Sequence, residues 1–171
     1  MPFDTPPPRP LLPGERPLWD QALALVNRDL AATLPDWRPL CLLAHAPWAE
    51  GEPEQVYVSL ADGASYHGQP LWPGSATSLD AAVSAVAEAA QDTVMEFLWQ
   101  AWPVCPVHNL GMHVGQGGQG GQDGRDSDGP AWWCAGGTDP KDPDHTRAAV
   151  GALDTLQRPH RPNRKRRRRG R

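Results

Sequence analysis

Apolar residues recur at helical spacing near the start of the chain and predict a first helix. Residues 17–34 begin with a proline and stop before Pro35. Proline is well tolerated in the first turn of a helix and ends one when it follows the last turn. The apolar stripe of this segment consists of Leu18, Ala22, Leu25, Val26, Leu30 and Leu34. A single stripe of this kind predicts a helix with one face against the core.

A second and longer stripe occupies residues 77–102 and ends at Pro103. Thr77 and Asp80 resemble a capping box at its start. The stripe consists of Val83, Val86, Ala90, Val94, Phe97, Leu98 and Ala101. The residues Glu88, Gln91, Asp92 and Glu96 fall largely on the other side. We interpret that side as a solvated face and not as a carboxylate site.

Between these helices the pattern changes to that of β-strands. Residues 38–45 form a continuous apolar run, which is typical of a buried strand, and residues 56–60 alternate like a half-buried one. The turn signal Ala-Asp-Gly-Ala follows, and a third strand is expected in residues 65–72. The sequence therefore predicts an α+β fold with two helices on a short antiparallel sheet.

Proline and glycine mark segments that we expect to lack packed structure. The 171 residues include 20 prolines and 17 glycines, and six of the prolines lie in residues 1–14. Such a lead-in favours extended chain, and the Gly/Gln-rich run at 115–130 cannot bury apolar surface. We predict one domain over residues 15–157, with a flexible loop at 115–130, a disordered lead-in and a disordered tail at 158–171.

Charge is segregated along the chain, although the formal net charge is only −4. All 20 acidic residues precede the tail, which holds nine of the 16 basic residues. Clustered arginine neutralises phosphates, so the tail is a candidate for nucleic-acid binding without sequence preference. Its candidate contacts are Arg164, Lys165, Arg166, Arg167, Arg168 and Arg169. The acidic remainder opposes this binding. The competing interpretations are docking of the tail on that remainder and compositional drift in an Arg-rich coding sequence.

No secretory signal begins the chain, and no stretch reaches the roughly 20 apolar residues of a membrane span. We therefore expect a cytoplasmic protein without a membrane partner. The three cysteines are an odd number and argue against a disulfide framework. Metal binding, burial and redox chemistry are the roles left for them.

The segment Trp-Pro-Val-Cys-Pro-Val-His, residues 102–108, has the spacing of a zinc knuckle. Zinc takes four tetrahedral donors, commonly thiolates and imidazoles, and Cys-x-x-His directs two of them from one turn. A lone cysteine in Trp-Trp-Cys-Ala-Gly-Gly would add the third. The candidate ligands are Cys105, His108 and Cys134, with His113 or His145 as the fourth. The sequence predicts a zinc-knuckle-like segment toward the C-terminus and leaves the fourth ligand open.

Two other interpretations compete with a structural metal site. Cys105 and Cys134 could be buried as small apolar residues, as we expect for Cys41 in its apolar run. Alternatively, three ligands and a bound water would make a catalytic centre. The acid–base partner would then come from the loop acids Asp139, Asp142 and Asp144.

The motif pair also carries a resemblance. Trp-Pro-Val-Cys-Pro-Val-His-Asn-Leu-Gly-Met-His followed by Trp-Trp-Cys, within Asp80 to Leu153, resembles a set of uncharacterised small actinobacterial proteins. Because those proteins have no established activity, the resemblance implies a shared feature at Cys105, His108 and Cys134 and no function. The Gly/Gln-rich loop and the Arg-rich tail depart from the resemblance.

Together these patterns predict a non-catalytic, metal-stabilised binding or regulatory accessory protein. Zinc is the expected metal, and the candidate partners are an unidentified protein and, through the tail, nucleic acid. A nucleic-acid-associated protein acting through its tail is the first alternative. A metal-dependent enzyme is the second.

Overall fold

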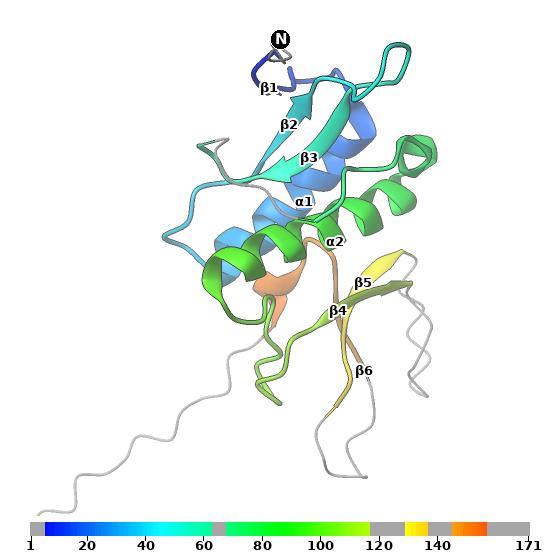
Figure 1. Cartoon of the computed structure of the whole chain (residues 1–171). Coiled ribbons are helices and arrows are strands. Elements are labelled where there is room, and N and C mark those ends of the chain that lie inside the picture. Colours follow the sequence, from blue (N-terminus) through cyan, green and yellow to red (C-terminus); the bar gives the residue numbers. More distant parts are fainter. Residues whose placement is uncertain (1–5, 63–67, 117–128, 137–144, 157–171) are drawn as a thin grey trace, which may run out of the picture.

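The computed structural model describes residues 6–62, 68–116, 129–136 and 145–156. Two helices lie between two small antiparallel sheets, one on either side (Figure 1). The predicted α+β fold with two helices is confirmed. The strands form two three-stranded sheets, however, where the sequence predicted one.

The helices α1 (Pro17–Thr33) and α2 (Leu79–Leu98) pack against each other in the middle of the molecule (Figure 1). The core residues of α1 and α2 follow the predicted stripes closely, because burial repeats with the helical period. The buried apolar residues of the two helices include Trp19, Ala22, Val26, Leu30, Val83, Val86, Ala90 and Val94.

The ends of α2 differ from the prediction. Ser78 and not Thr77 is the N-cap, and the Ser78 hydroxyl accepts a hydrogen bond of 3.2 Å from the backbone N–H of Ala81. The helix ends at Leu98 because Trp99 adopts the left-handed conformation, with φ 55°. Phe97, expected in the core, is exposed.

The first sheet has the order β1 (Arg9–Pro10), β2 (Cys41–His45) and β3 (Gln55–Ser59). Strand β1 lies inside the lead-in 1–14, which was expected to be disordered. All pairs are antiparallel. The third strand expected at 65–72 does not form in its described part, residues 68–72.

The second sheet has the order β4 (His113–Gln116), β5 (Pro130–Cys134) and β6 (His145–Ala149). Both pairs are antiparallel, and a register shift interrupts the pairing of β5 with β6 between Trp132 and Trp133. The middle of the predicted Gly/Gln-rich loop, residues 117–128, and the tail from residue 157 lie outside the described residues.

One hydrophobic core connects the helices with both sheets. It includes Val58 of β3, Val86 of α2 and, from the second sheet, Trp132 and Cys134 of β5. The candidate ligand Cys134 is thus embedded in the same core as the helices. Among the described residues, no helix is long and apolar enough to cross a membrane.

Candidate metal centre

A tight turn between α2 and β4 carries the first two candidate ligands. Val104 and Gly111 pair across its base as an isolated antiparallel bridge. The N–H of Asn109 donates to the carbonyl of Cys105 over 2.9 Å, and Asn109 has φ 57°, a left-handed conformation that asparagine tolerates better than most residues. The closed turn brings the Sγ of Cys105 to 3.6 Å from Nδ1 of His108.

Helix α2 holds this turn at its base through Gln91. The Nε2 of Gln91 donates to the carbonyl of Trp102 over 2.9 Å and to that of Met112 over 2.8 Å. A further hydrogen bond of 2.8 Å runs from the N–H of Met112 to the carbonyl of Pro103. The sequence placed Gln91 on a solvated face, whereas the structure uses it to fix both ends of the cysteine turn.

Strand β5 supplies the third candidate ligand. Side chains of a strand alternate between its two faces, and both Trp132 and Cys134 are completely buried, whereas Trp133 between them is only half-buried. One tryptophan of the pair therefore faces the core and the other does not. Cys134 therefore points to the same side as Trp132, toward the helices.

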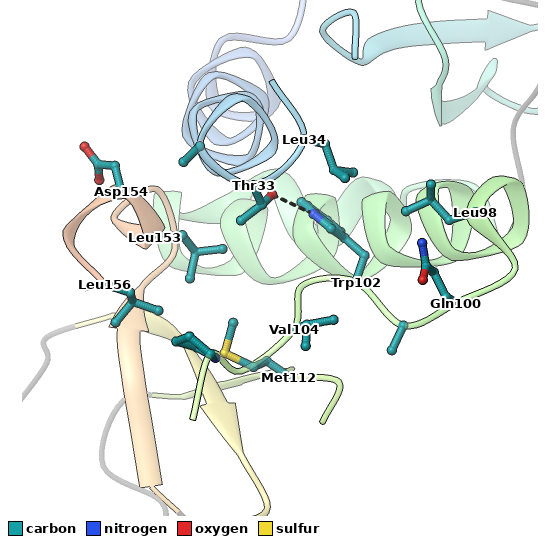
Figure 2. Close-up of a pocket in the computed structure, with 13 residues that line it drawn as sticks. Thr33, Leu34, Leu98, Gln100, Trp102, Val104, Met112, Leu153, Asp154 and Leu156 are labelled. Carbon is teal, nitrogen blue, oxygen red and sulfur yellow. Dashed lines mark hydrogen bonds between the residues drawn. The ribbon is translucent and has the colours of Figure 1, made fainter. Parts of the chain in front are cut away.

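Two polar residues on α1 position the two cysteine segments relative to each other. The indole N–H of Trp132 donates to Asp29 over 2.6 Å, and that of Trp102 donates to Thr33 over 2.9 Å (Figure 2). Asp29 and Thr33 are four positions apart and so lie on one side of the helix. The two indole rings meet edge to face with centroids 5.8 Å apart.

The three donor atoms of Cys105, His108 and Cys134 all lie within 4.8 Å of one another. Nδ1 of His108 lies 3.3 Å from the Sγ of Cys134 and 3.6 Å from that of Cys105. Zinc–sulfur and zinc–nitrogen bonds at tetrahedral angles separate such donors by roughly 3.6–3.8 Å. The two nitrogen–sulfur distances are therefore close to those between corners of one tetrahedral metal site.

Backbone amides point at the sulfur of Cys105. Burial alone raises the pKa of this thiol, but hydrogen bonds from the N–H groups of His108 and Val107, together with the Cys134 thiol, bring its pKa below the ordinary value. Amide donors stabilise a thiolate, which is the form that binds metal.

The sulfur of Cys134 accepts one backbone hydrogen bond where that of Cys105 accepts two. Burial raises the pKa of its thiol, and the neighbouring Cys105 sulfur raises it further, while a hydrogen bond from the N–H of Gly136 opposes both. The positive charge of Arg147 on β6 lowers the pKa of both thiols. Burial is the main cause of the raised pKa of Cys134, and a cation held between the two sulfurs would favour the thiolate form of both.

The two candidates for the fourth ligand occupy different register positions. His113 on β4 pairs with Trp133, its side chain is exposed, and its ring packs against the Trp133 ring with centroids 5.2 Å apart. His145 on β6 is the register partner of Cys134, and its side chain lies outside the described part of the structure. The structure therefore brings Cys105, His108 and Cys134 together and does not bring His113 to them.

Cys41 does not belong to this group of donors. Cys41 is half-buried in β2 and donates to the carbonyl of Leu60 over 3.3 Å, and burial raises its pKa. The candidate nucleic-acid contacts at 164–169 and the loop acids Asp139, Asp142 and Asp144 fall outside the described residues.

Asp29 is a residue near the centre whose role the sequence analysis missed. Besides the indole of Trp132, its carboxylate accepts backbone N–H groups of Gly151 over 2.6 Å and Leu153 over 2.8 Å. Burial raises the pKa of Asp29, and these three donors partly offset the increase. A signal was present, since Asp29 falls between Val26 and Leu30 on the apolar stripe.

An apolar pocket of about 510 Å³ adjoins the turn. The C-terminal ends of α1 and α2 contribute Leu34 and Leu98, and the cysteine turn contributes Val104 and Pro106 (Figure 2). Trp102 lies between these walls, with its indole directed at Thr33. One wall of the pocket is therefore part of the segment that carries Cys105 and His108.

Comparison with protein-family models, with curated proteins and with solved structures gave no match.

Proposed function

We propose that this chain is a non-catalytic accessory protein with a binding or regulatory role, and that bound zinc stabilises its functional region. The observation that carries the proposal is the convergence of three donors from two separate segments. His108 and Cys134 are 26 positions apart in the chain, yet their donor atoms lie 3.3 Å apart.

The chemistry of the donors favours zinc. Two sulfurs and an imidazole are ligands that zinc accepts in tetrahedral structural sites, whereas magnesium and calcium prefer oxygen. Backbone N–H groups directed at both sulfurs are the outer contacts that support bound thiolates. All three ligand residues belong to this chain, and both cysteines are completely buried.

A metal at this position would add a direct link between two segments that are far apart in the chain. The cysteine turn leaves α2, and Cys134 ends the central strand of the second sheet. A metal that binds the folded protein but not the unfolded chain contributes its binding free energy to the stability of the fold. We infer that zinc fixes the turn on the sheet.

The binding role rests on the surface beside the metal ligands. Val107 is 60% exposed and Leu110 is 43% exposed, although both belong to the closed turn. Val104 and Pro106 of the same turn line the apolar pocket. Pockets and exposed apolar side chains of this kind are typical of ligand or partner sites, so metal binding would hold the recognition surface in shape.

A catalytic role has less support. A metal enzyme needs a general acid or base near its bound water. Within the described residues, Asp29 is the buried carboxylate, and three N–H donors already occupy it. We therefore favour the structural role for the metal.

Elemental mass spectrometry of the untagged full-length protein tests the proposal. We expect near-stoichiometric zinc in the natural chain and loss of zinc from the Cys134→Ser variant. The Cys41→Ser variant is the matched control, because Cys41 lies in β2 and bonds to Leu60, and it should retain the metal. Folded natural protein without bound metal, and without uptake of added zinc, would refute the proposal.

A further inference from the structure

Three donors lie close enough together to hold a metal ion, and the pairing of β5 with β6 points to a fourth. The backbone of His145 pairs directly with that of Cys134. Directly opposed residues of an antiparallel pair belong to the same face of the sheet, with Cβ atoms about 4.5–5.5 Å apart. His145 therefore occupies a register position on the face to which Cys134 belongs.

A β-bulge is responsible for this pairing. Trp132 pairs with Ala148, and regular antiparallel pairing would continue with Arg147 and would then place Thr146 opposite Cys134. The observed partner of Trp133 is instead Thr146, so one extra residue is accommodated in β6. A bulge of one residue changes which residue faces a given partner. Here it replaces a threonine by a histidine opposite Cys134.

The same pairing rule separates His113 from the ligand group. Its partner across β4 and β5 is Trp133, which neighbours Cys134 along the strand and so belongs to the opposite face. The His113 ring packs on the Trp133 ring, and the His113 side chain is exposed. The two histidines that the sequence could not distinguish thus belong to opposite faces of the second sheet.

We propose that His145 is the fourth metal ligand, which closes a Cys2His2 site and leaves no position for a bound water. This inference rests on the proposed function, because it requires that Cys105, His108 and Cys134 bind a metal. It deepens that proposal, since a closed four-ligand site is typical of structural zinc, and an open site is typical of catalytic zinc.

Cobalt(II) titration of the full chain tests the assignment, with visible absorption as the readout. Tetrahedral cobalt absorbs strongly, and thiolate ligands add charge-transfer bands in the near ultraviolet. For His145→Ala we expect weaker visible bands and a loss of affinity that exceeds the roughly 10- to 100-fold typical of losing an outer-shell contact. For the matched control His113→Ala we expect unchanged bands and affinity.

The His145→Cys variant keeps the test decisive if His145→Ala does not fold. A cysteine at this position should bind cobalt tetrahedrally and increase the sulfur charge-transfer absorption over that of the natural chain. No increase, or natural cobalt affinity in His145→Ala, would overturn the assignment of His145. Absence of cobalt binding by the natural chain would refute the proposed function itself, so the two failures are distinguishable.

Discussion

The sheets β1–β2–β3 and β4–β5–β6 each contain three antiparallel strands, yet they are attached to the helices in different ways. In the first sheet, residues 42–44 of β2 and 56–59 of β3 are all buried. In the second sheet, burial is concentrated in β5, while the described residues of β4 and the residue Ala149 of β6 are half-buried or exposed.

Polar contacts make up for the smaller apolar burial of the second sheet. Asp29 of α1 binds β5 through Trp132 and the chain after β6 through Gly151 and Leu153. Gln91 of α2 binds both ends of the cysteine turn. The first sheet also receives a polar contact, from the Thr93 hydroxyl of α2 to the carbonyl of Val58, but it adds this contact to continuous apolar burial. The second sheet depends more on long-range polar contacts and, as we propose, on a metal.

Removal of the metal should produce the largest difference in stability between the two sheets. Structural zinc contributes roughly 10–16 kcal/mol of apparent binding free energy, so chelation should abolish amide protection in β4, β5 and β6. Strands β2 and β3 should keep most of their protection, because none of the proposed metal ligands lies in them and their buried contacts do not involve the metal. Hydrogen exchange read by mass spectrometry, with and without chelator, measures the difference. Equal loss in both sheets would mean that they form one cooperative unit.

Replacing Asp29 by alanine should have the next largest effect. The change leaves three N–H donors without their acceptor, and we expect the free energy of unfolding to fall by about 3 kcal/mol. Chemical denaturation measures this loss. The exposed residue Asp36 offers a control, and Asp36→Ala should be close to neutral. A neutral Asp29→Ala would show that these bonds contribute little.

Asp29 also predicts a dependence of stability on pH. Because its pKa in the folded protein lies above the ordinary value of 3.8, the folded protein binds the proton more tightly than the unfolded chain does. The proton-linked part of the contribution of Asp29 to stability is therefore fully present below pH 3.8 and is lost as pH rises through the folded-state pKa, while its hydrogen bonds contribute separately. Asp29→Asn, which does not titrate, should remove this part of the slope in denaturation measured across pH.

Replacing Gln91 by alanine should have a smaller and more local effect. The variant loses two hydrogen bonds to the carbonyls of Trp102 and Met112, and we expect a stability loss of about 1–2 kcal/mol. Zinc affinity should fall as well, since the cysteine turn loses its support from α2. Competition with a coloured chelator measures the affinity. Gln21→Ala on the exposed side of α1 should change neither quantity.

The sequence predicted the features of the fold that depend on local periodicity. Both helices were predicted because Val26, Leu30, Val83 and Val86 recur with the helical period and face one core. The strand at 38–45 was predicted from its apolar run. The N-cap was misplaced by one residue, since Thr77 and Ser78 are chemically equivalent caps and only the backbone geometry selects Ser78.

Features that depend on pairing between distant segments could not be predicted in the same way. The split into two sheets follows from which strands meet, and the bulge at β6 follows from the register of β5 with β6. The Cys-x-x-His spacing predicted the turn with Cys105 and His108, and the sequence also nominated Cys134 as the third donor, but only the fold shows that Cys134 lies beside them. Gln91 resembles any solvated helix residue until the carbonyls of Trp102 and Met112 are placed beside it.

The edge-to-face contact of Trp102 and Trp132 gives the protein an intrinsic optical reporter. One indole precedes Cys105 and the other precedes Cys134, and both are almost fully buried with centroids 5.8 Å apart. Transitions of aromatic rings this close couple, so the pair should contribute a distinct circular dichroism signal in the ultraviolet. Its amplitude would follow the approach of the two cysteine segments in real time, without any added label.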